Sequence, residues 1–109
     1  NVLDALLRGI VPHTTALLPN YPNPFNPETW IPFQLHQDAT VTIAIYNRAG
    51  RVIRTLNVGH QAAGSYGTPE RAAHWDGRNE QGEFVSSGGY FVEMVAGDFR
   101  KIRRIILLK

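Results

Sequence analysis

The chain contains no cysteine, so neither a disulfide framework nor thiolate metal ligation can organise its fold. It has no apolar run of the about eighteen residues that a spanning helix needs, and no signal peptide opens it. An excess of one charge is also missing, because 11 basic and 9 acidic side chains leave a formal net charge of +2. This balance indicates neither a nucleic-acid-binding nor a membrane-inserting surface. Stability must therefore come from packing.

Methionine occurs only as Met94, and the first residue is Asn1, so we expect the chain to be the C-terminal piece of a longer protein. Its 109 residues suit one domain with a single core. Residues 2–10 carry apolar side chains at helical spacing, which predicts a short helix there. We expect residues 1–16 to end an upstream region or linker. This helix would either dock on an upstream domain or be a frayed end.

From residue 29 the apolar period becomes two, which is typical of β-strands. Strands are predicted in TWIPFQLH, TVTIAIYN, RVIRTLNVG, AAHWD, FVSSGGYFVEMVAG and FRKIRRIILLK, and NRAGR predicts a hairpin turn. HQAAGSYGTPER is predicted as a longer loop. Pro32 suggests an edge strand, and the unbroken apolar run at 105–108 suggests a strand covered on both faces. The whole pattern predicts an all-β, immunoglobulin-like antiparallel β-sandwich of about seven strands over residues 17–109.

The stretch NYPNPFNPETW precedes the first clear strand and is rich in proline and asparagine. Because proline fixes φ and favours extended geometry before it, residues 18–27 are predicted to form a polyproline II rod with the asparagines in one row. We expect Phe25 to cap the core and the amides to satisfy main-chain groups of a neighbouring strand. The alternative is an exposed proline-rich ligand for an aromatic groove.

A second turn-rich stretch, WDGRNEQGE, offers Trp75 as a core anchor and Asp76 as an acceptor for the N–H groups of Arg78 and Asn79. Gly77 and Gly82 would supply positive φ. Calcium is an alternative because Asp76, Asn79 and Glu80 are oxygen donors, but the donor spacing of a calcium loop is not met. We therefore expect no metal ion and no cofactor.

No pattern of catalytic residues is found, and the protein is expected not to be an enzyme. The histidines, at 13, 36, 60 and 74, lack zinc-ligand spacing, and the serines lie outside any nucleophile elbow. The basic residues of the last strand either protect a sheet edge or bind an anionic polymer. Trp30 and Tyr66 could be sugar-stacking platforms, although no aromatic row at strand spacing supports this.

The assembled motifs resemble those of a known family, the type A C-terminal sorting domain of cargo exported by the bacterial type IX secretion system. The second half also resembles the immunoglobulin-like domain of the flagellar hook-capping protein, through WDG, an amide-rich turn and SGGY. The residues that carry the resemblance are Asn20, Pro22, Asn23, Pro24, Phe25, Asn26, Pro27, Trp75, Asp76, Gly77, Asn79, Gly82, Gly88 and Tyr90. Gly89 departs from the small aliphatic residue common before the tyrosine, and the loop at 60–71 is longer than in compact members.

The resemblance implies a non-catalytic signal that outer-membrane secretion machinery reads during export through the periplasm to the cell surface or medium. It also implies that the last strand is the recognition segment, with Arg100, Lys101, Arg103, Arg104 and Lys109 as its charged residues. Neither nucleic acid nor membrane insertion is implied. The alternative function is a structural immunoglobulin-like spacer or docking module that packs on an upstream domain.

Overall fold

The computed structural model describes residues 11–109, and this range contains nine β-strands. The strands are β1 (Ala16–Leu17), β2 (Thr29–Ile31), β3 (Phe33–Leu35), β4 (Ala39–Tyr46), β5 (Val52–Gln61), β6 (Gly64–Tyr66), β7 (Ala73–Trp75), β8 (Gly88–Ala96) and β9 (Phe99–Leu107). The helix predicted at 2–10 lies outside the described residues. Within them, no helix is long and apolar enough to cross a membrane. The prediction of an all-β antiparallel domain is confirmed for the described part of the chain.

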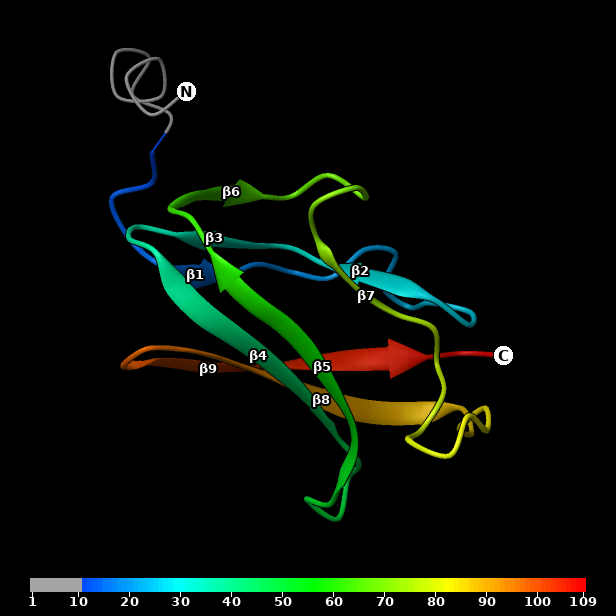
Figure 1. The fold of residues 1–109 in the computed structure, drawn as a ribbon. Coiled ribbons are helices and arrows are strands. Elements are labelled where there is room, and N and C mark those ends of the chain that lie inside the picture. The colour runs from blue at the N-terminus through cyan, green and yellow to red at the C-terminus, as the bar shows by residue number, and fades with distance from the viewer. Residues whose placement is uncertain (1–10) are drawn as a thin grey trace.

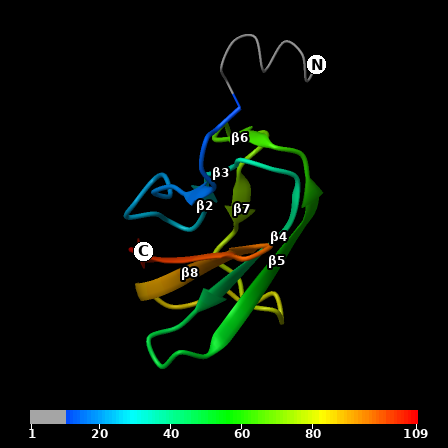
Figure 2. The same ribbon diagram turned by 90° about the vertical axis from the view of Figure 1, so that its left-hand side faces the viewer.

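The strands form two layers (Figures 1 and 2). One layer is a four-stranded sheet in the order β5-β4-β8-β9, and the other contains the sheets β1-β3-β6 and β2-β7. Every pair of named strands is antiparallel. The core lies between the layers because β4 and β8 turn alternate apolar side chains inward, as the period of two requires.

The hairpin β4–β5 follows the predicted pattern closely. Val41, Ile43 and Ile45 are all 0% exposed and face the opposite layer. In the connecting turn, the Asn47 side-chain oxygen accepts hydrogen bonds from the N–H groups of Ala49 and Arg51, both at 3.0 Å. The strand pattern and the local turn chemistry therefore support the same register.

The predicted strand at 29–36 is divided at Pro32. β2 pairs with β7, whereas β3 pairs with both β1 and β6 and is the central strand of its sheet, so the edge-strand prediction is wrong for β3. Proline has no N–H to donate, and it lies at the point where the chain changes partners. Its carbonyl still accepts a hydrogen bond from the N–H of Leu18 at 3.0 Å.

Two further expectations need correction. The loop at 60–71 contains β6, whose Tyr66 is only 6% exposed and stacks on Phe33 with ring centroids 4.8 Å apart, so it is no exposed sugar platform. The run at 105–108 is not covered on both faces, because Leu108 is 56% exposed while Ile105 and Leu107 are fully buried. The four-stranded sheet has an inner face on the core and an outer face toward solvent.

Candidate functional site

The segment between β1 and β2, residues 18–28, is here named the entrance loop. Tyr21 and Trp30 exchange two main-chain hydrogen bonds, at 2.9 and 2.8 Å, so the loop leaves and returns at the same place. Bends at 22–24 and 26–27 interrupt it, and the predicted straight polyproline II rod is wrong. The burial of Phe25 is confirmed at 2% exposed, while the prolines at 22, 24 and 27 stay exposed.

The asparagines of the entrance loop have different roles instead of forming one row. The Asn20 amide donates to the Thr29 hydroxyl at 3.0 Å, and both side chains are buried where the loop closes. The Asn23 side-chain oxygen accepts a hydrogen bond from the N–H of Ile106 in β9 at 3.1 Å. Asn26 is exposed. The expectation that an amide satisfies a neighbouring strand is therefore confirmed for Asn23.

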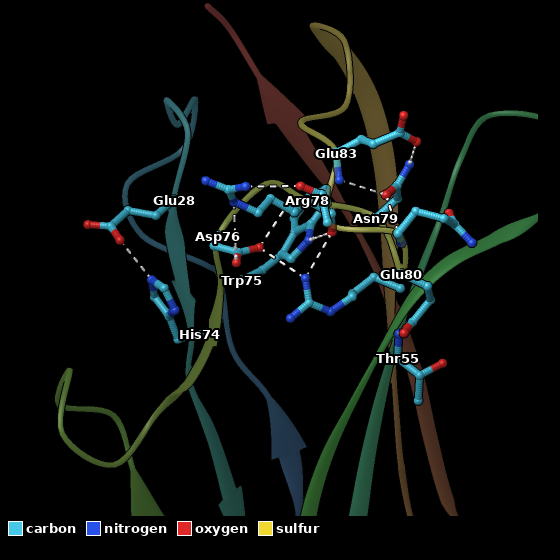
Figure 3. Close-up of polar contacts among 12 residues, drawn as sticks. Glu28, Thr55, His74, Trp75, Asp76, Arg78, Asn79, Glu80 and Glu83 are labelled. Atoms are coloured by element: carbon cyan, nitrogen blue, oxygen red, sulfur yellow. Dashed lines mark hydrogen bonds and ion pairs between the residues drawn. The ribbon is translucent and has the colours of Figure 1, made fainter.

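The turn after β7, residues 76–83, is here named the edge turn, and Figure 3 shows its polar contacts. Trp75 is 0% exposed and donates its indole N–H to the Arg78 carbonyl at 2.9 Å. The Asp76 carboxylate accepts from the N–H of Arg78 at 3.0 Å, as predicted. The N–H of Asn79 bonds the Glu83 carbonyl instead, which corrects the second half of that prediction. Gly82 has a φ of 81°, which fits the reversal.

The entrance loop and the edge turn meet in space. A Cβ on Gly77, whose φ is 79°, would lie 2.5 Å from the Pro27 carbonyl oxygen, so only glycine fits at this contact. The ring of Trp75 lies between those of Phe25 and Tyr90, with 5.6 Å between centroids in both pairs. The Tyr90 hydroxyl donates to the Ser86 carbonyl at 2.6 Å, just before Gly88 opens β8. The two sequence motifs therefore form one structural unit.

This unit covers part of each edge of the four-stranded sheet. At the β5 edge, the N–H of Glu80 bonds the Ile53 carbonyl at 3.0 Å, and the Glu80 carboxylate accepts from the N–H of Thr55 at 2.6 Å (Figure 3). At the β9 edge, Phe25 donates to the Ile106 carbonyl and accepts from the N–H of Leu108, both at 3.0 Å. A covered edge cannot pair with a foreign strand.

Only the C-terminal half of the β9 edge is covered. Ile106 turns its N–H and its carbonyl toward the entrance loop, and alternation along the strand turns those of Ile102 and Arg104 to the same side. Among residues 11–109, no main-chain group bonds Ile102 or Arg104 from that side. A short open edge is therefore left at the N-terminal half of β9.

The basic residues predicted for recognition do not form one cluster. The Arg103 guanidinium donates to the Leu17 carbonyl at 2.7 Å, so it ties β9 to the opposite layer. The Arg100 side chain is 70% exposed and lies 3.4 Å from the Glu93 carboxylate, and Lys101 is exposed. The Arg104 guanidinium lies against Gly89, and the Lys109 ammonium is 5.7 Å from the centroid of the Phe84 ring. Alternate residues of β9 point to opposite faces, which separates these charges.

The oxygen donors considered for calcium are engaged by the protein. The Asp76 carboxylate pairs with Arg54 at 3.0 Å, and the Asn79 side-chain oxygen accepts from the N–H groups of Gln81 and Glu83 (Figure 3). Among residues 11–109, no three acidic, histidine or cysteine side chains converge as a metal ligand set. The sequence did not predict that Arg54 contacts Asp76 or that Glu80 contacts Thr55. Each pair joins β5 to a residue more than twenty positions away, and no local pattern links them.

Comparison with solved structures finds the same fold in larger proteins. Dimeric latent PorU from Porphyromonas gingivalis aligns with 86% of this chain and 9% of its own, at a TM-score of 0.62 and 16% identity. PorZ of the same organism, an essential surface component of its type IX secretion system, aligns with 96% of this chain and 12% of its own, at a TM-score of 0.54 and 20% identity. FlgD from P. aeruginosa aligns with 67% of this chain and 54% of its own, at a TM-score of 0.51 and 27% identity.

This chain thus corresponds to a small part of PorU and PorZ and to about half of FlgD. No curated protein matches the sequence. The sequence model of the FlgD Ig-like domain matches residues 25–98, a range that contains Phe25 of the entrance loop, the whole edge turn and Tyr90. The chain therefore belongs to the FlgD Ig-like domain family.

Proposed function

We propose that this domain is a non-catalytic sorting domain of an exported bacterial protein. Outer-membrane secretion machinery reads it at β9 and carries the protein through the periplasm to the cell surface or medium. The observation that supports this most is the half-open edge of β9, and the fold likeness to PorU and PorZ gives the setting. Neither nucleic acid nor membrane insertion takes part in the proposed role.

The open edge suits recognition by strand addition. An extended segment of a receptor can bond the outward main-chain groups of Ile102 and Arg104, which supplies affinity without a deep pocket. The side chains of Arg100 and Lys101 are exposed on the two faces next to this edge and would favour a receptor strand with acidic residues. The covered half of β9 fixes where such a strand must stop, because the entrance loop occupies the edge from Ile106 onward.

The proposal is tested by export of a reporter fused to the full 109-residue chain in a bacterium that has a type IX system. Deleting all of β9 would be uninformative, because Ile105 and Leu107 are 0% exposed and their loss would unfold the domain. Ile102→Pro is sharper, since it removes one outward N–H and leaves the β8 ladder intact. Ile102→Thr, which keeps the N–H, is the matched control.

We expect the Ile102→Pro fusion to accumulate in the periplasm and the Ile102→Thr fusion to reach the surface. Thermal unfolding of both purified variants must show that each is folded. Surface display of a folded Ile102→Pro fusion at the wild-type level would refute recognition at this edge.

A structural spacer or docking module is the second candidate. It is favoured by a cleft of about 410 Å³ near the point where the described chain begins. The cleft is lined by residues from 13–15, 36–39 and 96–99, at one end of the two layers. Small-angle scattering of the parent protein would show a fixed interdomain angle if an upstream domain packs there, and independent tumbling would exclude this candidate.

A further inference from the structure

The outer face of the four-stranded sheet carries two hollows that share Phe91. The first has a volume of about 390 Å³ and is lined by Arg48, Gly89, Phe91 and Arg104. The second has a volume of about 470 Å³ and is lined by Tyr46, Gly50, Phe91, Glu93 and Ile102. We name the two together the outer groove. They follow one another along β8, one on each side of the Phe91 ring.

The first hollow is cationic. Arg48 reaches it from the β4–β5 turn and Arg104 from β9. A Cβ on Gly89 would lie 3.4 Å from Nε of Arg104, which places the guanidinium against β8 at this position. Among residues 11–109, neither guanidinium has a carboxylate within ion-pair distance. Two such groups offer paired N–H donors to one carboxylate.

The second hollow is largely apolar at its walls. Ile102 is 52% exposed, and the half-buried rings of Phe91, on the neighbouring β8, and Tyr46, on β4 one strand further, line the same hollow. The Glu93 side chain is only 12% exposed, and its carboxylate accepts from the Tyr46 hydroxyl at 2.9 Å and lies 3.4 Å from Nε of Arg100. Glu93 is thus paired already, and the hollow can accept an apolar side chain beside a satisfied carboxylate.

We propose that the outer groove binds an extended segment of a partner polypeptide in which a bulky apolar residue and an aspartate or glutamate stand two positions apart. In an extended chain such residues point the same way and lie about 6–7 Å apart, which matches hollows that straddle a single residue of β8. Within the described residues the guanidinium groups of Arg48 and Arg104 have no carboxylate partner, so an acidic partner fits better than a basic one. Export through the β9 edge is a separate proposal, and either can fail without the other.

The test uses three labelled peptides and the full chain. The first, Ser-Leu-Ser-Glu-Ser-Tyr, has the required spacing. The second replaces its glutamate with glutamine, and the third, Ser-Leu-Glu-Ser-Ser-Tyr, places leucine and glutamate on opposite faces. We expect saturable binding of the first peptide, with amide NMR shifts confined to residues near 46–50, 89–93 and 102–104. Binding of the other two should be weaker by about tenfold, the usual effect of losing one charge-assisted contact.

Protein variants give the second arm. Arg48→Gln with Arg104→Gln should weaken the first peptide at least about tenfold, whereas Arg71→Gln, an arginine that stacks on Tyr66 in the other layer, should leave it unchanged.

Any of four binding results would overturn the proposal: no saturable binding of the first peptide, equal binding of all three peptides, unchanged binding by the double variant, or NMR shifts confined to the opposite layer. A fifth result concerns the chain itself. Self-association of the chain that the double variant abolishes would assign the groove to a second copy and would likewise overturn it.

Discussion

Replacing Phe25 with alanine tests whether the entrance loop belongs to the core. Phe25 is 2% exposed, packs against Trp75 with ring centroids 5.6 Å apart, and lies beside β9 through two main-chain hydrogen bonds. The main-chain bonds do not depend on the side chain, so the substitution removes mainly packing. Burial of a phenylalanine that leaves a cavity on truncation is worth about 3–5 kcal/mol.

We expect Phe25→Ala to lower the free energy of unfolding by about 3–4 kcal/mol, near the low end of this range because the loop can partly collapse. Urea unfolding followed by tryptophan fluorescence measures the loss, since Trp75 reports directly on the site. Phe84→Ala is the control. Phe84 is 51% exposed and interacts mainly with the Arg78 guanidinium 4.0 Å from its ring centroid, so its loss should cost no more than about 1 kcal/mol. Equal effects of the two substitutions would show that the loop does not pack as described.

Three further predictions concern the edge turn and the outer groove. Gly77→Ala should destabilise the fold by more than about 2 kcal/mol, because the new Cβ meets the Pro27 carbonyl. Gly50→Ala is the control: Gly50 has a similar φ of 81° but open space around it, so the substitution should cost about 1 kcal/mol in the same unfolding assay. Asp76→Ala should lower the free energy of unfolding by about 1–2 kcal/mol, because it removes the hydrogen bond to the N–H of Arg78 and the ion pair with Arg54, the latter discounted for partial exposure. Asp98→Ala, at an exposed residue of the β8–β9 turn, is the control, and an equal loss of stability in both variants would contradict this role of Asp76. The hydrogen bond to Glu93 raises the pKa of Tyr46. The stability that this bond gives the fold is therefore complete below the usual tyrosine pKa of about 10 and is lost as pH rises through the pKa of folded Tyr46. Glu93→Gln should lower the pKa of Tyr46 in a phenolate absorbance titration, and an unchanged titration would refute the contact.

The faces of the long strands could be predicted from the sequence because period-two patterns record which side chains are buried. Val41 and Ile43 in β4 and Val92 and Met94 in β8 stand at alternate positions of their predicted strands, and all four lie in the core. Such a pattern says nothing about partners. It could not show that Pro32 divides one apolar stretch between two sheets, or that Tyr66 draws a loop into pairing with β3.

The candidate site divides in the same way. Local chemistry predicted the Asp76–Arg78 turn and the burial of Phe25, because each follows from the residues beside it. The contact between Gly77 and Pro27 joins chain segments fifty positions apart, and no local sequence pattern predicts it. The sequence also did not predict that the basic residues of β9 are separated. They are neighbours in the sequence, but consecutive residues of a strand point to opposite faces of the sheet.

Amide hydrogen exchange along β9 tests the central claim most directly. The N–H of Leu108 bonds the Phe25 carbonyl and that of Ile106 bonds the Asn23 side chain, while Ile102 and Arg104 turn theirs to the open edge. Residue-resolved exchange on the native chain should therefore show slow exchange at Ile106 and Leu108 and fast exchange at Ile102 and Arg104. Equally slow exchange at all four amides, or fast exchange at Ile106 and Leu108, would contradict a β9 edge that the entrance loop covers in one half and leaves open in the other.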